Sequence, residues 1–188
     1  MGPAPGVFTD PEALIEHLQA LGTLSSADTG AMTELDHGLQ TAAHLSRDWP
    51  DDVELQIAGL LHDLAHPWDD AGQTNHPSIG AAAVRDMLGE RVAELIAGHV
   101  EAKRYLVAVA PEYRSRLSAD SVATLEAQGG PLTPDEAARF ASRPERRALV
   151  GLRLADDAAK VPGAVVPDLG DWLAPLRGLC ARGGRGSR

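Results

Sequence analysis

The sequence predicts an all-α fold, and three observations favour it. Hydrophobic residues make up 44% of the 188 residues, whereas aromatic residues make up only 4%. Alanine and leucine are abundant, and runs of β-branched residues are scarce, which favours helix over strand. The length suits one domain with its own core, so we expect a single domain over residues 1–180 and a disordered, glycine-rich tail over 181–188.

Apolar periodicity and helix-terminal residues place the elements in order. Pro11 stands in the first turn of the first predicted helix, which Gly22 ends. Two longer helices follow at about 32–47 and 50–66, the second ending beside Pro67. Pro111 interrupts the chain after a later helix. The remaining helices are expected at 75–89, 91–102, 119–127, from 134 for a short stretch, at 144–160 and at 169–180.

Charge and cysteine content exclude several classes of function. A formal net charge of −10 repels phosphate backbones, so we expect no nucleic-acid partner. No apolar run approaches the roughly 20 residues that span a bilayer, and no signal peptide is recognisable; we expect a cytoplasmic protein without a membrane partner. The single cysteine, Cys180, excludes an intramolecular disulfide and a cysteine-based metal cluster. The sequence does not indicate an oligomeric state.

The run LLHDLAHPW contains the most informative motif, the adjacent residues His62 and Asp63. An imidazole beside a carboxylate can hold or bridge divalent metal ions. His66 follows four residues after His62, and we predict it on the same helix face, near the metal but not necessarily bound to it, where it would support a ligand or face the substrate. Nitrogen and oxygen donors without sulfur suit iron, manganese, magnesium or zinc, and Asp63 could bridge two ions. The candidate ligands are His37, His62, Asp63, His76, His99 and Asp156.

The order of these residues resembles the HD-domain superfamily, whose metal-dependent helical bundles are mostly phosphohydrolases. Further segments are similar to its mixed-valence di-iron oxygenase branch, which includes myo-inositol oxygenase and the enzymes that convert 2-amino-1-hydroxyethylphosphonate to glycine and phosphate. These segments are HVEAKRY at 99–105, LSADSVATLEAQGGPL at 117–132 and RLADDAAK at 153–160. The resemblance covers roughly residues 34–160 and implies a single HD-domain helical bundle.

The resemblance also implies a cofactor and a substrate. Two iron ions, Fe(II) and Fe(III), would be held by the candidate ligands, with Asp63 shared between them and O2 as co-substrate. The substrate would be a small anionic organophosphonate. Asp63, His66 and Lys103 would take part in catalysis. Lys160 would support the residues that contact the substrate without contacting the substrate itself. Those contacts would be His66, Lys103, Ser121, Thr124, Gln128 and Arg153.

The spacing of three of these expected substrate contacts supports an anion site independently of the resemblance. Ser121, Thr124 and Gln128 share one face of a helix that Ser118 can cap, and we expect them in its first two turns. Helix N-termini favour anions through their free N–H groups and dipole.

Two positions depart from the family pattern. Relatives in this branch carry a tyrosine ten positions before the first histidine ligand and a glutamate seven before it, which cap an iron and recognise the substrate amine. Gap-free counting gives Ala27 and Gly30 here. This departure leaves open an α-hydroxyphosphonate without that amine, or one with another group in its place.

Three functions therefore remain open from the sequence. We favour a di-iron oxygenase that oxidatively cleaves the C–P bond of a small α-hydroxyphosphonate and releases phosphate. The alternative is a phosphohydrolase that uses Mn, Mg or Zn to attack a phosphate ester. The third is a catalytically silent HD domain that serves as a sensor or binding module. Oxygen dependence separates the first two, and metal content separates the third.

Overall fold

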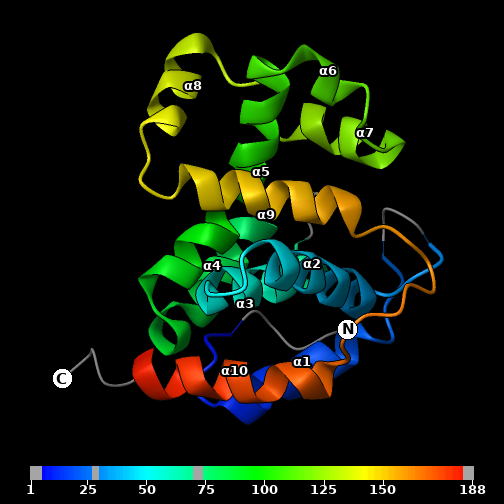
Figure 1. Ribbon diagram of the computed structural model, residues 1–188, viewed down its shortest axis with the longest axis vertical. Coiled ribbons are helices and arrows are strands. Elements are labelled where there is room, and N and C mark those ends of the chain that lie inside the picture. The colour runs from blue at the N-terminus through cyan, green and yellow to red at the C-terminus, as the bar shows by residue number, and fades with distance from the viewer. Residues whose placement is uncertain (1–5, 27–29, 70–73, 184–188) are drawn as a thin grey trace.

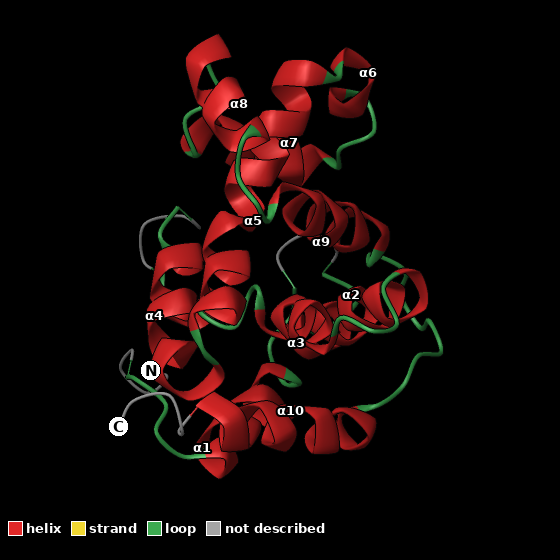
Figure 2. Cartoon of the chain, turned by 60° about the vertical axis from the view of Figure 1, so that its left-hand side comes forward, coloured by secondary structure: helices red, strands yellow, loops and turns green. Residues whose placement is uncertain are grey.

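A computed structural model describes residues 6–26, 30–69 and 74–183, and it confirms the all-α prediction (Figures 1 and 2). In the described residues the only strand-like feature is an isolated antiparallel bridge between Ser25 and Thr33. The α-helices are α1 (Pro11–Leu21), α2 (Glu34–Asp48), α3 (Val53–Leu61), α4 (His76–Leu88), α5 (Glu90–Val109), α6 (Pro111–Arg114), α7 (Ala119–Ala127), α8 (Pro134–Ala141), α9 (Arg146–Ala158) and α10 (Leu169–Gly183), and η1 (His66–Trp68) is a 3-10 helix.

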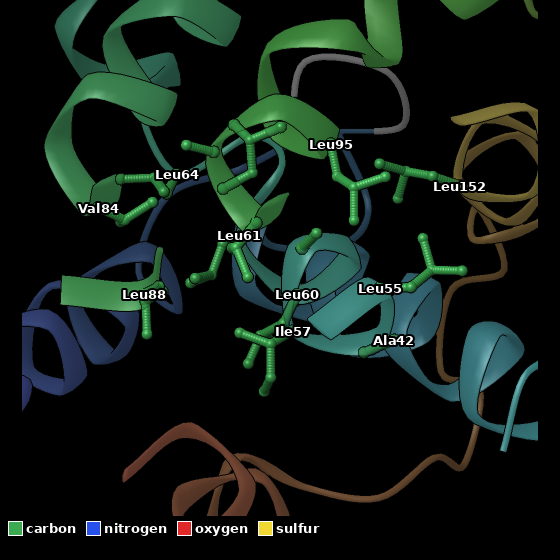
Figure 3. Close-up of a cluster of buried hydrophobic side chains, with 14 of the residues drawn as sticks. Ala42, Leu55, Ile57, Leu60, Leu61, Leu64, Val84, Leu88, Leu95 and Leu152 are labelled. Atoms are coloured by element: carbon green, nitrogen blue, oxygen red, sulfur yellow. The ribbon is translucent and has the colours of Figure 1, made fainter. Parts of the chain in front are cut away.

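Helix α3 lies at the centre of the main hydrophobic core. Its residues from Leu55 to Leu61 are all buried, as expected for a short helix with apolar side chains on every side. In Figure 3, Leu55 points toward Leu152, and Ile57 points to the opposite side of α3; both belong to the main hydrophobic core. The end of α3 is therefore fixed in position by packing on all sides.

Glycines let the helices that carry candidate ligands approach closely. A Cβ atom at Gly38 of α2 would lie 2.5 Å from the carbonyl oxygen of Leu60 on α3. A Cβ atom at Gly98 of α5 would lie 2.6 Å from Leu149 Cδ2 on α9. Gly38 directly follows His37, and Gly98 directly precedes His99. Both glycines thus bring a histidine-bearing helix against a neighbour that also carries or leads to candidate ligands.

The helices beyond this centre lie at opposite ends of the molecule. Helices α6, α7 and α8 are at one end, and α1 and α10 are at the other, with α9 crossing between them (Figure 1). None of the helices in the described part of the chain combines the length and apolar character needed to cross a bilayer.

Several helix boundaries differ from the sequence prediction, most clearly the ends of α3, α5 and α10. The predicted helix at 50–66 ends as α3 at Leu61, and turns closed by Leu64 N–H to Leu61 O and His66 N–H to Asp63 O follow. Pro67 has no N–H to donate and so limits how far a helix could continue, but it lies six residues beyond Leu61 and does not itself account for this end. Helix α5 continues to Val109, and α10 extends into the expected tail as far as Gly183.

Candidate metal centre and substrate cavity

The fold brings all six candidate ligands together from different elements. His37 lies in α2, His99 in α5 and Asp156 in α9. His62 directly follows α3, Asp63 lies in the next turn, and His76 is the first residue of α4. The four histidines and Asp156 are buried, so these polar side chains face one another inside the protein.

Asp63 lies between two groups of histidines. Its Oδ2 atom is 3.1 Å from His62 Nε2 and 3.5 Å from His37 Nε2. Its Oδ1 atom is 3.4 Å from His76 Nε2 and 3.5 Å from His99 Nε2. Asp156 joins the first group, with Oδ1 3.3 Å from His37 Nε2. The carboxylate of Asp63 therefore has the geometry of a bridge between two sites.

Backbone carbonyls fix how three of these histidines are protonated. The Nδ1 atoms of His37, His62 and His99 lie 2.9, 2.8 and 2.8 Å from the carbonyl oxygens of Ala159, Gly59 and Ile96. A carbonyl only accepts, so each Nδ1 carries the hydrogen, and in a neutral ring Nε2 keeps its lone pair. Each ring therefore presents an electron-pair donor toward the carboxylates, as histidine ligands of metals do.

This donor set fits a metal ion. Lone pairs of Nε2 and carboxylate oxygens repel one another unless a cation lies between them. His62 Nε2 is buried and has no hydrogen-bond partner among the described residues. Two ligands at right angles around an ion about 2.1 Å away would lie about 3 Å apart, and the donor separations at Asp63 are 3.1–3.5 Å. The residues present can therefore hold a metal.

The raised pKa of His37 also indicates that positive charge is favoured between these carboxylates. Burial lowers this pKa, but the hydrogen bond and charge of Asp156 and the charge of Asp63 outweigh burial and raise it to about 9. A cation among these carboxylates is thus favourable, whether it is a proton or a metal ion.

His66 lies beside the second group without sharing a helix with His62. The prediction of one common helix face is wrong, because α3 ends before His66; the intervening turns bring the ring back. His66 Nε2 is 3.2 Å from Asp63 Oδ1, and Nδ1 is 3.1 Å from Oε2 of the buried Glu34. By distance alone, His66 could form a metal-binding group with Asp63 and His76.

A cavity of about 40 Å³ that opens to solvent adjoins the candidate ligands. Every predicted substrate contact lines it, together with Ser26 and Val100. Lys103 Nζ donates to Thr124 Oγ1 at 3.0 Å, and Lys160 Nζ donates to Ser121 Oγ at 3.1 Å. Each of these two hydroxyl groups in the cavity lining is thus paired with an ammonium group, which suits an anion with several oxygens.

The helix N-terminus contributes less to this lining than the sequence indicated. Ser118 caps α7 as expected, with Oγ accepting from Ser121 N–H at 3.1 Å. Gln128, however, directly follows the last residue of α7, so it lies at the C-terminal end of the helix and not in its first two turns, which cover about seven residues. The groups that face the cavity are therefore mainly side chains.

Arg153 lines the cavity and also contacts one of the candidate ligands. Its Nη1 donates to Asp156 Oδ2 at 2.8 Å, its Nε donates to Tyr113 Oη at 3.0 Å, and its Nη2 pairs with Asp157. Tyr113 also donates to Asp157. Burial lowers the pKa of Arg153, but Asp156 and Asp157 raise it well above its ordinary value. The guanidinium thus stays charged and orients Asp156.

Several residues of this site were not identified from the sequence. Asp69 Oδ2 accepts from the N–H groups of Asn75 and His76 at 2.7 Å each, so it fixes the first turn of α4. Glu34 and Tyr113 act through contacts that join segments far apart in the sequence. No local pattern marks them. Ala27 lies outside the described residues, and Gly30 is exposed with a φ of 59°.

Comparisons with known proteins agree with this architecture. An HD-domain family model matches residues 36–157. The chain is 39% identical to a hydroxymethylphosphonate dioxygenase of Gimesia maris over 151 residues, which cover 76% of this chain and 75% of that protein. It is 32% identical to a [1-hydroxy-2-(trimethylamino)ethyl]phosphonate dioxygenase (glycine-betaine-forming) of Leisingera caerulea over 154 residues, 77% of each chain. The chain therefore belongs to the HD-domain family.

Proposed function

We propose that this protein is an HD-domain oxygenase that cleaves the C–P bond of a small α-hydroxyphosphonate. The reaction would convert R–CH(OH)–PO3H2 and O2 to R–COOH and H3PO4, with carbon oxidised and dioxygen reduced by the same number of electrons. The observation that carries this proposal is that Asp63 lies between two groups of histidines and lines a cavity that Lys103 and Arg153 also line. The chain shares 39% and 32% of its residues with two phosphonate dioxygenases over about three quarters of its length, and this similarity supports the same reaction class.

The cofactor we propose is a pair of iron ions. His37, His62, Asp156 and Asp63 Oδ2 would hold one, and His76, His99 and Asp63 Oδ1 would hold the other. Bound iron would supply Lewis acidity toward the substrate oxygens and the electrons needed to activate O2. Nitrogen and oxygen donors without sulfur suit this metal.

The side chains around the cavity would bind and orient the phosphonate. Lys103 and Arg153 would neutralise its charge, while Ser121, Thr124 and Gln128 would contribute neutral polar groups. Lys160 would act through its hydrogen bond to Ser121 Oγ. Glu34 would accept from His66 Nδ1 and so point Nε2 toward Asp63 and the cavity. Burial of these groups strengthens each charge interaction with the substrate.

A metal-dependent phosphohydrolase is the second candidate, because the same cavity would accept the tetrahedral anion of a phosphate ester. The cavity side chains do not distinguish a phosphonate from a phosphate. Dependence on O2 does.

The test is oxygen uptake measured together with phosphate release. Iron-loaded protein, reduced with ascorbate, would be given α-hydroxyphosphonates in the presence and absence of O2. We expect one phosphate released for each O2 consumed and no phosphate without O2. Phosphate release at the same rate without O2 would mean hydrolysis and would refute the oxygenase.

Two variants make the test specific to the metal centre. Asp63→Asn should lose iron and activity, because an amide cannot bridge two cations as a carboxylate does. His44→Gln is the matched control, since His44 also lies in α2 but faces a different cavity, away from the candidate ligands. An Asp63→Asn protein that still binds two irons and consumes substrate would contradict the assignment.

A further inference from the structure

A closed set of hydrogen bonds joins three side chains from two helices. Arg153 and Asp157 lie about one turn apart in α9, and Tyr113 lies in α6. Arg153 and Tyr113 are buried, and Asp157 is half-buried. Of the three, Arg153 lines the cavity beside the candidate ligands. An effect of Tyr113 or Asp157 on a bound anion would therefore pass through Arg153.

The direction of each hydrogen bond follows from the chemistry of the groups. A guanidinium only donates, so Arg153 Nε donates to Tyr113 Oη at 3.0 Å and Nη2 donates to Asp157 Oδ1. The phenol of Tyr113 has a single hydrogen, which it donates to Asp157 Oδ2. Burial and the charge of Asp157 raise the pKa of Tyr113 above its ordinary value, although Arg153 lowers it, so the phenol keeps this hydrogen. Each carboxylate oxygen of Asp157 thus accepts from one partner.

These contacts set the orientation of the guanidinium plane. Arg153 Nη1 also donates to Asp156 Oδ2 at 2.8 Å, so all the nitrogen atoms of the guanidinium are held. Each Nη atom carries a second N–H, and because the group is planar, Tyr113 and Asp157 determine where these N–H groups point. A freely turning arginine has to be ordered when it binds an anion, whereas this guanidinium is ordered beforehand.

The ring of Tyr113 also belongs to a small apolar cluster that includes α7. Tyr113, Val107 of α5 and Leu125 of α7 are buried in this cluster, which is separate from the main core. Leu125 directly follows Thr124, whose hydroxyl accepts from Lys103 in the cavity lining. Helices α6 and α7 lie at the same end of the molecule (Figure 1). Tyr113 therefore links the helix that carries Thr124 to the guanidinium on α9.

We propose that Tyr113, acting with Asp157, is a positioning residue that fixes the guanidinium of Arg153 for the substrate phosphonate. This inference rests on the proposed function, in which Arg153 binds the phosphonate. The hydroxyl of Tyr113 accepts from Nε and donates to Asp157, so its removal deprives both groups of a partner. The guanidinium then turns more freely, and an anion has to order it on binding.

Binding of methylphosphonate to the iron-loaded protein tests this role without turnover, because methylphosphonate has no α-hydroxyl group. Calorimetric titration would compare the unaltered protein with Tyr113→Phe, which keeps the ring and removes only the hydroxyl. We expect Kd to rise by about 10-fold, as for the loss of one hydrogen bond to a charged group. An unchanged Kd would overturn the inference and leave the oxygenase standing. Failure of the unaltered protein to bind methylphosphonate would overturn phosphonate binding itself, and the inference with it.

Tyr105→Phe is the matched control, because it removes the same hydroxyl from a tyrosine elsewhere. Tyr105 lies in α5, its ring centroid is 4.6 Å from that of Phe140, and it lines the cavity beside His44. Its Kd for methylphosphonate should stay within about 2-fold of that of the unaltered protein. A rise as large as that in Tyr113→Phe would assign the effect to general loosening and would overturn the inference.

Asp157→Asn tests whether the two residues act through the same guanidinium. The NH2 group of the amide cannot accept the hydrogen bond that a carboxylate oxygen accepts, so Kd should again rise by about 10-fold. Since either change frees the same group, the double variant should bind only about 10- to 20-fold more weakly, whereas independent effects would multiply to about 100-fold. The full product of the single effects would overturn a shared action on Arg153.

Kinetics with hydroxymethylphosphonate and O2 separate positioning from loss of structure. Tyr113→Phe should raise KM by about 10-fold and leave kcat and the iron content of each chain within about 2-fold, because the contact of Arg153 Nη1 with Asp156 remains. Iron content and kcat that fall together would indicate a structural role and overturn the inference. A lower kcat with an unchanged KM would overturn it as well.

Discussion

Alanine in place of Gly38 should destabilise the protein by forcing apart two helices that position candidate ligands. The added Cβ atom would lie 2.5 Å from Leu60 O, whereas ordinary van der Waals contact begins at 3.4 Å. The obstacle is a backbone oxygen, which cannot turn aside as the end of a side chain could. Helices α2 and α3 would therefore have to separate locally by about 0.9 Å, the difference between these two distances.

The expected size of the effect follows from two opposing contributions. Overpacking of a core usually costs about 1–3 kcal/mol, and the better helix propensity of alanine returns about 0.5–1 kcal/mol. A net loss of about 1–2 kcal/mol corresponds to a Tm lower by about 2–8 °C for a chain of this length. Displacement of His37 from Asp63 should also weaken iron binding by about 10-fold.

Thermal unfolding of the metal-free protein would measure the first effect, and iron titration the second. Gly178→Ala is the matched control, because Gly178 lies in α10 and a Cβ atom there would meet nothing within 4 Å. This control should be neutral or stabilising by up to about 1 kcal/mol, with unchanged iron binding. A Gly38→Ala protein with the Tm and iron affinity of the Gly178→Ala protein would refute the close-approach argument.

Three further predictions follow from the site and from an ion pair outside it. Glu34→Ala should lower kcat/KM by about 10- to 100-fold with little change in iron content, because His66 loses the acceptor that orients it. Glu34→Gln can still accept from His66 Nδ1, so in the same assay it should lose much less activity than Glu34→Ala. Arg153→Lys should raise KM for the phosphonate and lower iron content, since an ammonium group cannot replace a guanidinium that contacts three partners; unchanged iron and KM would contradict this. The hydrogen bonds from Arg91 hold the pKa of Asp52 below its ordinary value, so the stabilisation is present above about pH 4 and is lost as pH falls through the lowered folded-state pKa. Asp52→Asn should therefore cost about 0.5–1 kcal/mol in denaturant unfolding at pH 7 and progressively less below pH 4, and a cost that is independent of pH would exclude the ion pair as its cause.

The sequence by itself determined the helices and the set of metal-type residues. Apolar periodicity, Pro11, Ser118 and Gly89 mark helices through interactions within a few residues, which is why most boundaries were predicted closely. The end of α3 was predicted five residues too late, because the apolar pattern continues through Leu64 and Ala65 although turns replace the helix after Leu61. The order of the candidate ligands and their resemblance to the HD-domain superfamily gave the same residues that the fold brings together.

The tertiary structure decided how those residues face one another. Contacts between Gly38 and Leu60 and between Gly98 and Leu149 set the spacing of the helices, and carbonyl oxygens up to 122 residues away in sequence orient the rings, as Ala159 does for His37. The pairing of Glu34 with His66 and the small volume of the cavity depend equally on long-range packing. A local pattern records which groups a segment offers, but the distances between those groups and the space around them arise only when separate segments pack.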